Sequence, residues 1–454
     1  MTNDFPELTI AILGAGPSGI FAAADILRKL PTSTVDIYDR LPAPYGLLRY
    51  GVAPDHLKMK TLENKLRKTL DDPRVRFVGN VEYGTSLRRA ELEDAYNAVI
   101  VSAGCPHAHV LGIEGEDLNG SFSAAELVSW YNGHPDAPAD FDLVGQNVVV
   151  VGAGNVALDV SRVLLKGSIG LRKTDVPDHV LVTLDDRMVS NVTVLSRGGV
   201  AQAKFTVAEL MEFESMDDVD IIVDPVDVQL SPADMELYDR SPQLRLTVDT
   251  FVRWSQTPVR GSGRSITFRF RSIPMAINGG DRVRSVSITR AGRQQLDDAS
   301  TEQQPADIAA DMVFSAVGYR GKPLPGLPFD VASGVIPNTS GRIDGLGTAS
   351  WYVTGWLKRG PTGVIGTNKA CSAATVDRLV EDIHAGRILD ASKHGFDAIK
   401  PVLAERNNTA TDWSGWQRIR AAEETMGQLQ GRDRAKIASL EQLMAEATRA
   451  VSAR

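Results

Sequence analysis

Short apolar runs alternate with helical patterns from the beginning of the chain. The run Leu8–Leu13 predicts a buried β-strand, and the Ala-rich pattern that follows it to about Leu30 predicts a helix. A second apolar run, Val35–Tyr38, ends at Asp39. The order of strand, helix and strand predicts a βαβ unit.

The same pattern returns in the middle of the chain. A second apolar run, Asn147–Val151, precedes a helical pattern that continues through Leu165. After the insert Gly167–Met188, another strand is predicted at Val192–Leu195. The repetition predicts an α/β protein with two Rossmann-like domains, and its 454 residues agree with two or three domains.

The rest of the pattern is more varied. Three alternating segments in the second half predict antiparallel strands added to the second domain: Gln243–Val248, Ile266–Phe270 and Val283–Thr289. A further strand at Asp311–Gly318 ends in a glycine. Helices are predicted at about Lys369–Ala385 and in the C-terminal tail, Arg432–Arg454, which we expect to pack on the first domain.

Composition narrows the class of protein. The net charge of −8 argues against a nucleic-acid binder, which needs a basic surface. No apolar run approaches the length of about 20 residues that spans a bilayer. Asp4 and Glu7 stand where a signal peptide has basic residues, so we expect a cytoplasmic protein without membrane insertion.

The cysteines and histidines of the sequence show no pattern of a disulfide, redox or metal site. Cys105 and Cys371 are far apart in the sequence, so no disulfide framework and no CxxC motif is present. The seven histidines do not form a cluster with metal-ligand spacing. We therefore expect no metal site, and we expect both cysteines to be buried free thiols.

The turn after the first strand has the features of a dinucleotide site. Gly14 permits a tight turn, Gly16 allows a pyrophosphate to approach the backbone, and Gly19 allows the helix to pack on the sheet. The helix N-terminus attracts phosphate. Asp39, at the end of the second strand, is placed to accept hydrogen bonds from ribose. A glycine-rich turn in an ordinary α/β protein is the alternative.

The second turn repeats this chemistry with one difference. Gly152 and Gly154 occupy the first two glycine positions, and Ala157 replaces the third. Two such motifs in one chain indicate two nucleotide sites. Arg197 follows the next strand in place of an acid, and a basic residue there selects the 2′-phosphate of NADP.

Two other stretches have more than one interpretation. The predicted helix at His56–Leu70 is basic, and its basic face is either solvated or the docking site of an acidic partner. The glycine-dense turn from Gly355 to Gly366 can place backbone amides against a ring or a phosphate. A strand that ends at Ala103-Gly104 is typical of a backbone that comes close to a ligand.

Six motifs, in order, resemble the adrenodoxin-reductase-type ferredoxin–NADP+ reductases, including the mycobacterial and actinobacterial NADPH:ferredoxin reductases. They are GAGPSG, RYGVAPDH, GAGNVALDVSR, QAKFT, SAVGYRG and GWLKRGPTGVIGTN. The resemblance implies two three-layer ββα domains, as in glutathione reductase. Residues 1–106 and 319–454 would bind FAD, and residues 107–318 would bind NADP.

The resemblance also implies site residues. The residues it places at the two cofactors are Gly14, Pro17, Ser18, Gly19, Asp39, Arg40, Gly46, Leu47, Val81, Gly104, Trp356, Gly363, Val364 and Ile365 for FAD, and Gly152, Gly154, Asn155, Val156, Arg197 and Glu209 for NADP. His56 and Glu212 would form a polar pair near the flavin, with Asp159 close by. Taken alone, a histidine after Asp55 at a helix start is more often structural than catalytic.

The implied activity is hydride transfer from NADPH to FAD, followed by single-electron transfer to a ferredoxin or a similar small iron–sulfur protein. The enzyme would be a monomer or a weak dimer. One departure concerns specificity, because the family usually has two consecutive arginines where this chain has Arg197-Gly198. Strict preference for NADPH is therefore not expected.

Other functions share the same motifs. A flavin monooxygenase or an NADPH oxidase also needs two nucleotides, and an oxygen site has no sequence signature. A redox sensor that binds both nucleotides without turnover is a third possibility. A disulfide reductase is disfavoured, because no CxxC is present to receive electrons.

Overall fold

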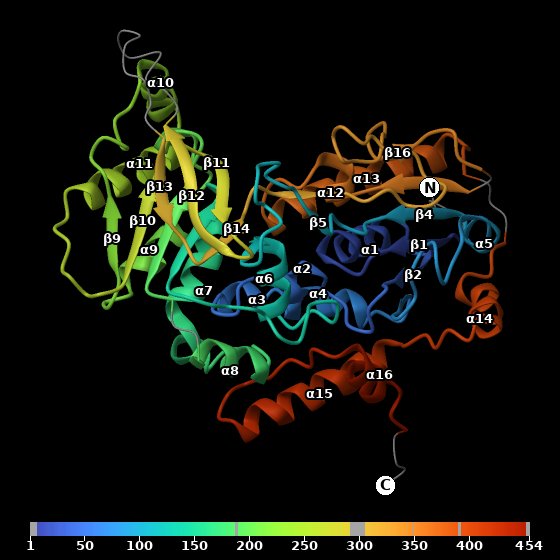
Figure 1. The fold of residues 1–454 in the computed structure, drawn as a ribbon. Coiled ribbons are helices and arrows are strands. Elements are labelled where there is room, and N and C mark those ends of the chain that lie inside the picture. Colours follow the sequence, from blue (N-terminus) through green and yellow to red (C-terminus); the bar gives the residue numbers. More distant parts are fainter. Residues whose placement is uncertain (1–6, 187–188, 291–304, 348, 389–391, 451–454) are drawn as a thin grey trace. The chain divides into compact units, whose positions relative to one another are not determined.

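The computed structural model describes residues 7–186, 189–290, 305–347, 349–388 and 392–450. Contacts divide the chain into two units (Figure 1). The first unit contains residues 1–107, 132–136 and 319–454, and the second contains residues 108–131 and 137–318. The short segment 132–136 thus belongs to the first unit although both of its flanks belong to the second.

A six-stranded sheet forms the centre of the first unit, in the order β16-β17-β4-β1-β2-β3. All neighbours are parallel except β16 and β17. In register, Ile10 of β1 (Thr9–Leu13) lies opposite Val35 of β2 (Thr34–Tyr38) and Ala98 of β4 (Ala98–Val101). The apolar runs of the sequence form these strands because the sheet is covered on both faces.

Two long helices of the first unit lie side by side on this sheet (Figure 1). Helix α1 (Pro17–Lys29) begins with a proline, whose fixed φ suits the first helical position. Helix α13 (Ile365–His384) packs along α1, and the Ser372 hydroxyl donates to the Ser18 carbonyl at 2.8 Å. The C-terminal part of the chain thereby joins the N-terminal βαβ unit.

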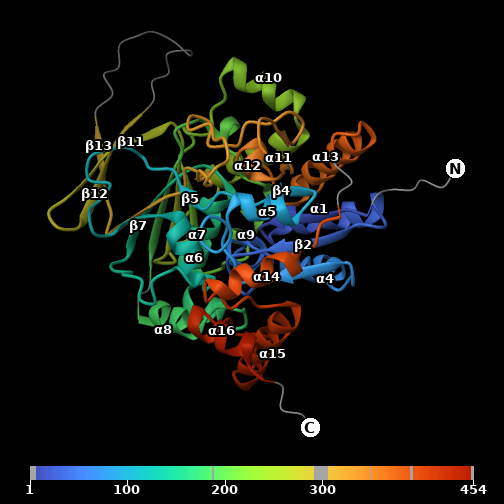
Figure 2. The same cartoon turned by 90° about the vertical axis from the view of Figure 1, so that its right-hand side faces the viewer.

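The C-terminal helices are also held to the first unit by buried charge. Helices α15 (Trp413–Leu429) and α16 (Leu440–Thr448) lie side by side (Figure 2). Glu423 of α15 accepts a hydrogen bond at 3.0 Å from Arg49, and both side chains are buried. Lys436, also buried, donates to the Arg49 carbonyl at 2.8 Å and to the Asn132 side-chain oxygen at 2.9 Å. These bonds connect segments that are about 300 or more residues apart in the sequence.

The second unit repeats the parallel sheet and adds a second layer of strands. Its sheet has the order β6-β14-β7-β8-β10-β9, and all neighbouring strands in it are parallel. A three-stranded antiparallel sheet, β11-β12-β13, packs on it through an apolar cluster that includes Val149, Val286 and Ile288. Helix α7 (Asn155–Leu171) also contacts the parallel sheet. The predicted fold class, α/β with two Rossmann-like ββα domains, is confirmed.

Two predictions about the second unit were wrong. The segment Gln243–Val248 belongs to helix α11 (Pro242–Ser255), which begins with a proline and is capped by the Ser241 hydroxyl. Strand β10 (Ser265–Arg269) pairs in parallel with its neighbours instead of antiparallel. The prediction for Val283–Thr289 is confirmed, because β12 (Val283–Arg290) is antiparallel to both β11 and β13.

The remaining elements complete the two units. In the first unit they are α2 (Leu47–Tyr50), α3 (Leu57–Lys60), α4 (Glu63–Leu70), β3 (Val75–Val78), α5 (Arg89–Ala95), β15 (Tyr319–Arg320), β16 (Arg342–Ile343), β17 (Ser350–Val353), α12 (Trp356–Arg359) and α14 (Phe396–Glu405). In the second they are β6 (Ser121–Ser123), α6 (Ala124–Tyr131), β7 (Asn147–Val151), α8 (Asp178–Asp186), β8 (Asn191–Leu195), the 3₁₀ helix Val200–Gln202, α9 (Val207–Glu214), β9 (Asp220–Val223), α10 (Pro232–Arg240), β11 (Ser272–Gly279), β13 (Ala306–Ala309) and β14 (Met312–Ser315). Strand β5 (His107–Ala108) spans the boundary between the units. Within the described ranges, no helix is both long enough and apolar enough to cross a membrane.

Candidate functional site: two dinucleotide turns

Four turns meet at one edge of the first unit's sheet. Strands β17, β4, β1 and β2 are parallel neighbours, so the turns that follow them lie at the same end. These turns carry Gly355, Gly104, Gly14 and Asp39. The Ser102 hydroxyl joins two of them by donating to the Gly14 carbonyl at 2.8 Å. Expected FAD residues from both ends of the sequence are thus brought together.

The three glycines of the first turn have different roles. Gly14 has φ +113°, and a Cβ there would lie 2.5 Å from the Ser102 carbonyl oxygen. A Cβ on Gly19 would lie 2.1 Å from the Gly14 carbonyl oxygen. A Cβ on Gly16, in contrast, would meet only the Gly46 Cα, at 3.9 Å. The fold therefore requires Gly14 and Gly19, whereas Gly16 leaves its outer side open to a ligand.

Asp39 is fixed beside this turn. Its carboxylate accepts hydrogen bonds from the amides of Ala15, at 2.8 Å, and Leu41, at 3.0 Å. Burial raises the pKa of Asp39, while these two amides act in the opposite direction. The Val81 amide donates to the Asp39 carbonyl at 2.9 Å. Each carboxylate oxygen can accept a further bond, as a ribose contact requires.

The next residue, Arg40, is anchored by the short segment 132–136. Its guanidinium pairs with Asp136 at 2.6 Å and lies 3.3 Å from the His134 ring nitrogen. The Asp136 amide donates to the other His134 nitrogen at 3.1 Å. Burial and the charge of Arg40 lower the pKa of His134 to about 4. The neutral imidazole accepts the amide bond, and Arg40 is held beside the expected ribose site.

The start of α13 carries further residues that are expected to bind FAD. Gly363 has φ +79°, and Val364 next to it is 63% exposed. Ile365 is the first residue of α13, whose N-terminus has free backbone amides. Trp356 begins α12, and its indole N–H is buried without an acceptor among the described residues. Such a donor suits a ring that carries carbonyl oxygens, so these residues fit an isoalloxazine.

Gly46 and Leu47 line the same region. Gly46 has φ +47°, and a Cβ on it would lie 3.1 Å from the Gly16 Cα. Leu47 begins α2 and is 39% exposed. The Tyr45 amide donates to the Ala15 carbonyl at 2.8 Å, which holds this segment against the first glycine turn. A flat ligand can pass here close to the backbone of both segments.

The second unit contains the second turn, between β7 and α7. Gly152 has φ +152°, and a Cβ there would lie 2.4 Å from the Ala316 carbonyl oxygen. A Cβ on Gly154 would meet no atom within 4 Å. Asn155 accepts a bond from the Thr206 amide at 3.0 Å, and Val156 follows in the first turn of α7. As in the first unit, the fold requires the first glycine and the second leaves space for a ligand.

Arg197 follows β8 and is exposed, without an ion pair among the described residues. Gly198, the next residue, accepts a hydrogen bond from the Arg271 amide at 2.9 Å. The Arg271 guanidinium lies beside Gly199, since a Cβ on that glycine would be 2.9 Å from it. A second arginine thus approaches the end of β8 from a distant part of the sequence.

The residues expected to be catalytic lie in different parts of the chain. His56 occupies the N-cap position of α3 in the first unit, and Asp159 and Glu212 lie on α7 and α9 in the second. The Glu212 side chain is 46% exposed and lies 3.8 Å from Lys166. Glu209, one turn earlier on α9, is buried.

Arg162 was not identified from the sequence. It is buried on α7 and pairs with Asp159 at 2.6 Å and with Glu209 at 3.2 Å. The i, i+3 spacing of Asp159 and Arg162 on a helix was the available signal. The bond to Glu209 spans 47 residues and has no local signal in the sequence. The arginine fixes the orientation of both carboxylates.

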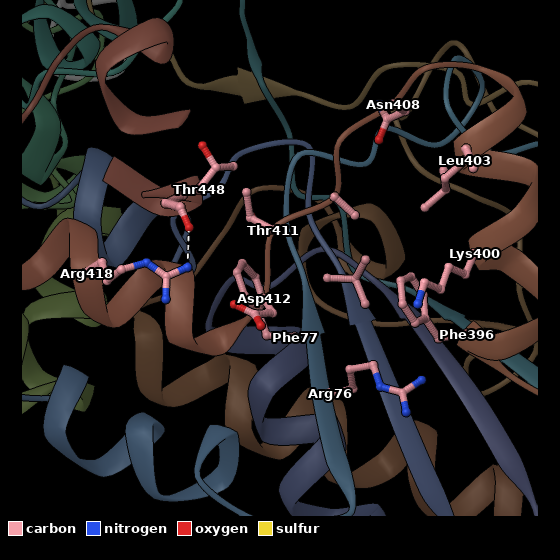
Figure 3. Close-up of a pocket in the computed structure, with 14 residues that line it drawn as sticks. Arg76, Phe77, Phe396, Lys400, Leu403, Asn408, Thr411, Asp412, Arg418 and Thr448 are labelled. Carbon is pink, nitrogen blue, oxygen red and sulfur yellow. Dashed lines mark hydrogen bonds between the residues drawn. The ribbon is translucent and has the colours of Figure 1, made fainter. Parts of the chain in front are cut away.

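A pocket of about 470 Å³ lies elsewhere on the first unit, between β3, α14 and the C-terminal helices (Figure 3). Its lining includes Arg76, Phe396, Lys400 and Thr411. None of the residues expected to bind a nucleotide lines it. The expected cofactor sites are instead at the edges of the two sheets.

Comparison with known proteins agrees with this arrangement. The model of the pyridine nucleotide-disulphide oxidoreductase family matches residues 8–207. NADPH-ferredoxin reductase FprA of Mycobacterium leprae is 40% identical over 454 residues, which cover 96% of this chain and 97% of the relative. The mitochondrial NADPH:adrenodoxin oxidoreductase of Arabidopsis thaliana is 35% identical, with 97% and 95% covered.

A solved structure of Mycobacterium tuberculosis FprA in complex with NADPH has a TM-score of 0.89 to this chain and is 38% identical to it. The match covers 97% of this chain and 99% of that one. The chain belongs to the NADPH–ferredoxin reductase family. The resemblance found in the six sequence motifs is therefore confirmed across nearly the whole length of a family member.

Proposed function

We propose that this chain is an FAD-containing NADPH–ferredoxin reductase. It passes a hydride from NADPH to FAD and then single electrons to a ferredoxin-type iron–sulfur protein. The observation that carries the proposal is the pair of dinucleotide turns, one in each unit, each with a second glycine that the fold itself does not need. Bound FAD supplies the switch from two-electron to one-electron chemistry.

The first unit, with the expected boundaries 1–106 and 319–454, binds FAD in this proposal. The turn Gly14–Gly19 and the N-terminus of α1 hold the pyrophosphate, and Asp39 binds the ribose of the ADP half. Trp356 and the segment Gly363–Ile365 lie at the isoalloxazine. Pro17, Ser18, Arg40, Gly46, Leu47, Val81 and Gly104 complete the proposed set.

The second unit, with the expected boundaries 107–318, binds NADPH. Gly152 and Gly154 form the pyrophosphate turn, with Asn155 and Val156 at the start of α7. Arg197 is the proposed partner of the 2′-phosphate, because it is exposed at the end of the strand next to β7.

For the polar groups near the reacting rings, we propose His56 and Asp159 as expected. Of the two α9 glutamates expected near the cofactors, Glu209 supports such a role better than Glu212. Glu209 is buried and oriented by Arg162, whereas Glu212 is half exposed beside Lys166. A carboxylate held in a fixed position can orient a proton donor, and a solvated one cannot do so as well.

Anaerobic stopped-flow reduction by NADPH tests the proposal, with a ferredoxin as the electron acceptor. We expect rapid bleaching of the flavin band, followed by ferredoxin-dependent reduction of cytochrome c. The same turnover repeated in air should form no matching peroxide. Stoichiometric peroxide in air would instead identify an oxidase or a monooxygenase. Nucleotide binding without turnover would identify a sensor. A cytoplasmic monomer or weak dimer is proposed, and sedimentation checks the oligomeric state.

A further inference from the structure

The helical stretch 57–70 of the first unit has two distinct faces. Helices α3 and α4 are separated by a turn at Thr61 and Leu62, both of which keep helical backbone angles. The Leu62 amide donates to the Met59 carbonyl at 3.1 Å across this turn, so the helical path continues from α3 into α4. One face packs on the core through Leu66 and Leu70, which are buried, and through Leu62, which is partly buried. Helix α4 contacts α1 on this side.

Another face of the stretch is basic. Lys58, Thr61, Lys65 and Lys68 are spaced by three, four and three residues, so they line up along one side of a helix. All four are exposed. We call these four residues the basic stripe. Lys58 and Lys68 are fewer than about three helical turns apart, so the three lysines present one field of positive charge.

The charge of the basic stripe is not compensated nearby. Lys58, Lys65 and Lys68 have no ion pair within the part of the chain that the structure describes. The acid of this stretch, Glu63, points to Arg420 at 3.7 Å and Arg434 at 3.4 Å instead. The whole chain has a net charge of −8, so the stripe is a local exception on an acidic molecule.

Apolar side chains flank the basic stripe. Leu57 is 58% exposed, and Met59 is 40% exposed. Exposed apolar groups next to separated charges are typical of a transient protein interface, in which the charges steer the partner and the apolar groups make contact. The N-cap of α3 is His56, the residue proposed to lie near the flavin. The basic stripe therefore begins at Lys58, two residues after His56 of the proposed redox site.

We propose that the basic stripe, with Leu57 and Met59, is the docking surface for the electron acceptor, a small iron–sulfur protein with an acidic surface. This inference rests on the proposed function. Each docked acceptor takes one electron into its cluster, so the two electrons of one NADPH leave in two successive encounters. Encounters of this kind need fast association and release, which surface charge provides without tight binding.

A charge-reversal variant tests the docking surface. The test variant is Lys58→Glu/Lys65→Glu/Lys68→Glu. The control variant, Lys173→Glu/Lys322→Glu/Lys400→Glu, makes the same change in net charge at exposed lysines outside the stripe. The FAD-loaded proteins are assayed with NADPH and an adrenodoxin-type [2Fe–2S] ferredoxin of net negative charge, with cytochrome c as reporter. Menadione serves as a second acceptor, because it is uncharged and needs no docking site.

We expect the test variant to lose about one to two orders of magnitude in kcat/KM for ferredoxin at low salt, mainly through KM, and to lose most of its salt dependence. Its reduction of menadione and the ferredoxin kinetics of the control variant should stay within about twofold of wild type. An unchanged KM in the test variant, or an equal loss in the control, overturns the docking surface alone. A wild-type protein that reduces menadione but not ferredoxin overturns the proposed acceptor, and the docking surface with it.

Discussion

The carboxylate of Asp39 accepts a hydrogen bond from the backbone amide of Ala15 at 2.8 Å. Asp39 follows β2, whereas Ala15 lies in the glycine turn after β1, and the two strands are parallel neighbours. One side chain therefore fixes the shape of the turn proposed to hold the FAD pyrophosphate and is also placed to bind the ribose. The pyrophosphate and ribose contacts are structurally coupled.

Replacing Asp39 by Asn should weaken FAD retention. Asn has nearly the same size as Asp but carries no charge, so its hydrogen bonds to the Ala15 amide and to a ribose hydroxyl are not charge-assisted. A charge-assisted hydrogen bond is worth about 1.5–3 kcal/mol. The expected loss is about one to two decades in the FAD dissociation constant, measured by release during dialysis or by fluorescence. Asp311→Asn is the control, because Asp311 accepts two amide bonds at 2.9 Å in the second unit. Equal FAD affinity in Asp39→Asn and wild type would contradict the proposed ribose contact.

Gly154→Val should remove NADPH binding while the protein stays folded and keeps FAD. A Cβ at Gly154 meets no protein atom within 4 Å, and its backbone, with φ −128°, suits a β-branched residue. The new side chain would occupy the space proposed for the pyrophosphate. Difference spectra with NADPH and the flavin absorbance measure the two sites separately.

The matched variant Gly152→Ala should behave differently. Its Cβ would lie 2.4 Å from the Ala316 carbonyl oxygen at a φ of +152°, so the second unit should lose stability. A lower melting temperature for Gly152→Ala than for Gly154→Val checks this. If Gly154→Val releases FAD and still binds NADPH, the two turns have been assigned to the wrong cofactors.

The sequence predicted the parts of the fold that depend on local pattern. Strands β1, β2, β7 and β8 and both glycine turns were identified, because buried parallel strands are short apolar runs and the turns need glycine. Gln243–Val248 was misassigned because its alternation also fits a helix. Pro242 at the first helical position and Ser241 at the N-cap favour a helix over a strand for this segment.

Contacts between distant residues could not be predicted in the same way. The segment 132–136 joins the first unit through bonds to Arg40, 96 residues from Asp136, and to Lys436, 304 residues from Asn132. Arg162 reaches Glu209 across 47 residues. Such pairs depend on tertiary packing, which a local pattern does not encode.

Acid should destabilise the first unit through His134. The folded-state pKa of this histidine is lowered to about 4 by burial and Arg40, against an unfolded value of about 6.5. The folded protein therefore binds fewer protons than the unfolded chain, so this stabilisation is present above about pH 6.5 and is lost as pH falls towards 4. The difference amounts to at most about 3 kcal/mol.

His134→Asn should remove this part of the pH dependence, because Asn can accept the Asp136 amide bond but does not titrate. Melting temperatures at about pH 7.5 and about pH 5 should differ less in this variant than in wild type. His394→Asn, at an exposed histidine, should keep the wild-type difference. The same pH dependence in all three proteins would show that His134 does not contribute.

The enzyme should prefer NADPH to NADH, but by a smaller factor than an enzyme with two consecutive arginines at this position. Arg197 is exposed and has no ion pair among the described residues, so its guanidinium is available to a 2′-phosphate. A charge-assisted bond is worth about 1.5–3 kcal/mol, or about one to two decades in affinity. Arg197→Ala should therefore raise the KM for NADPH and leave the KM for NADH nearly unchanged.

Two further variants test whether a second arginine contributes to recognition of the 2′-phosphate of NADPH. Gly198→Arg should sharpen the preference, at a cost in packing, because its Cβ would lie 2.9 Å from the Gln202 side chain. Arg271→Lys keeps a positive charge near Gly199 but loses the fork that reaches the Gln229 carbonyl at 2.8 Å. The measurement is kcat/KM for both nucleotides in each protein. If Arg197→Ala weakens both nucleotides equally while Arg271→Lys weakens NADPH alone, Arg271 and not Arg197 recognises the phosphate.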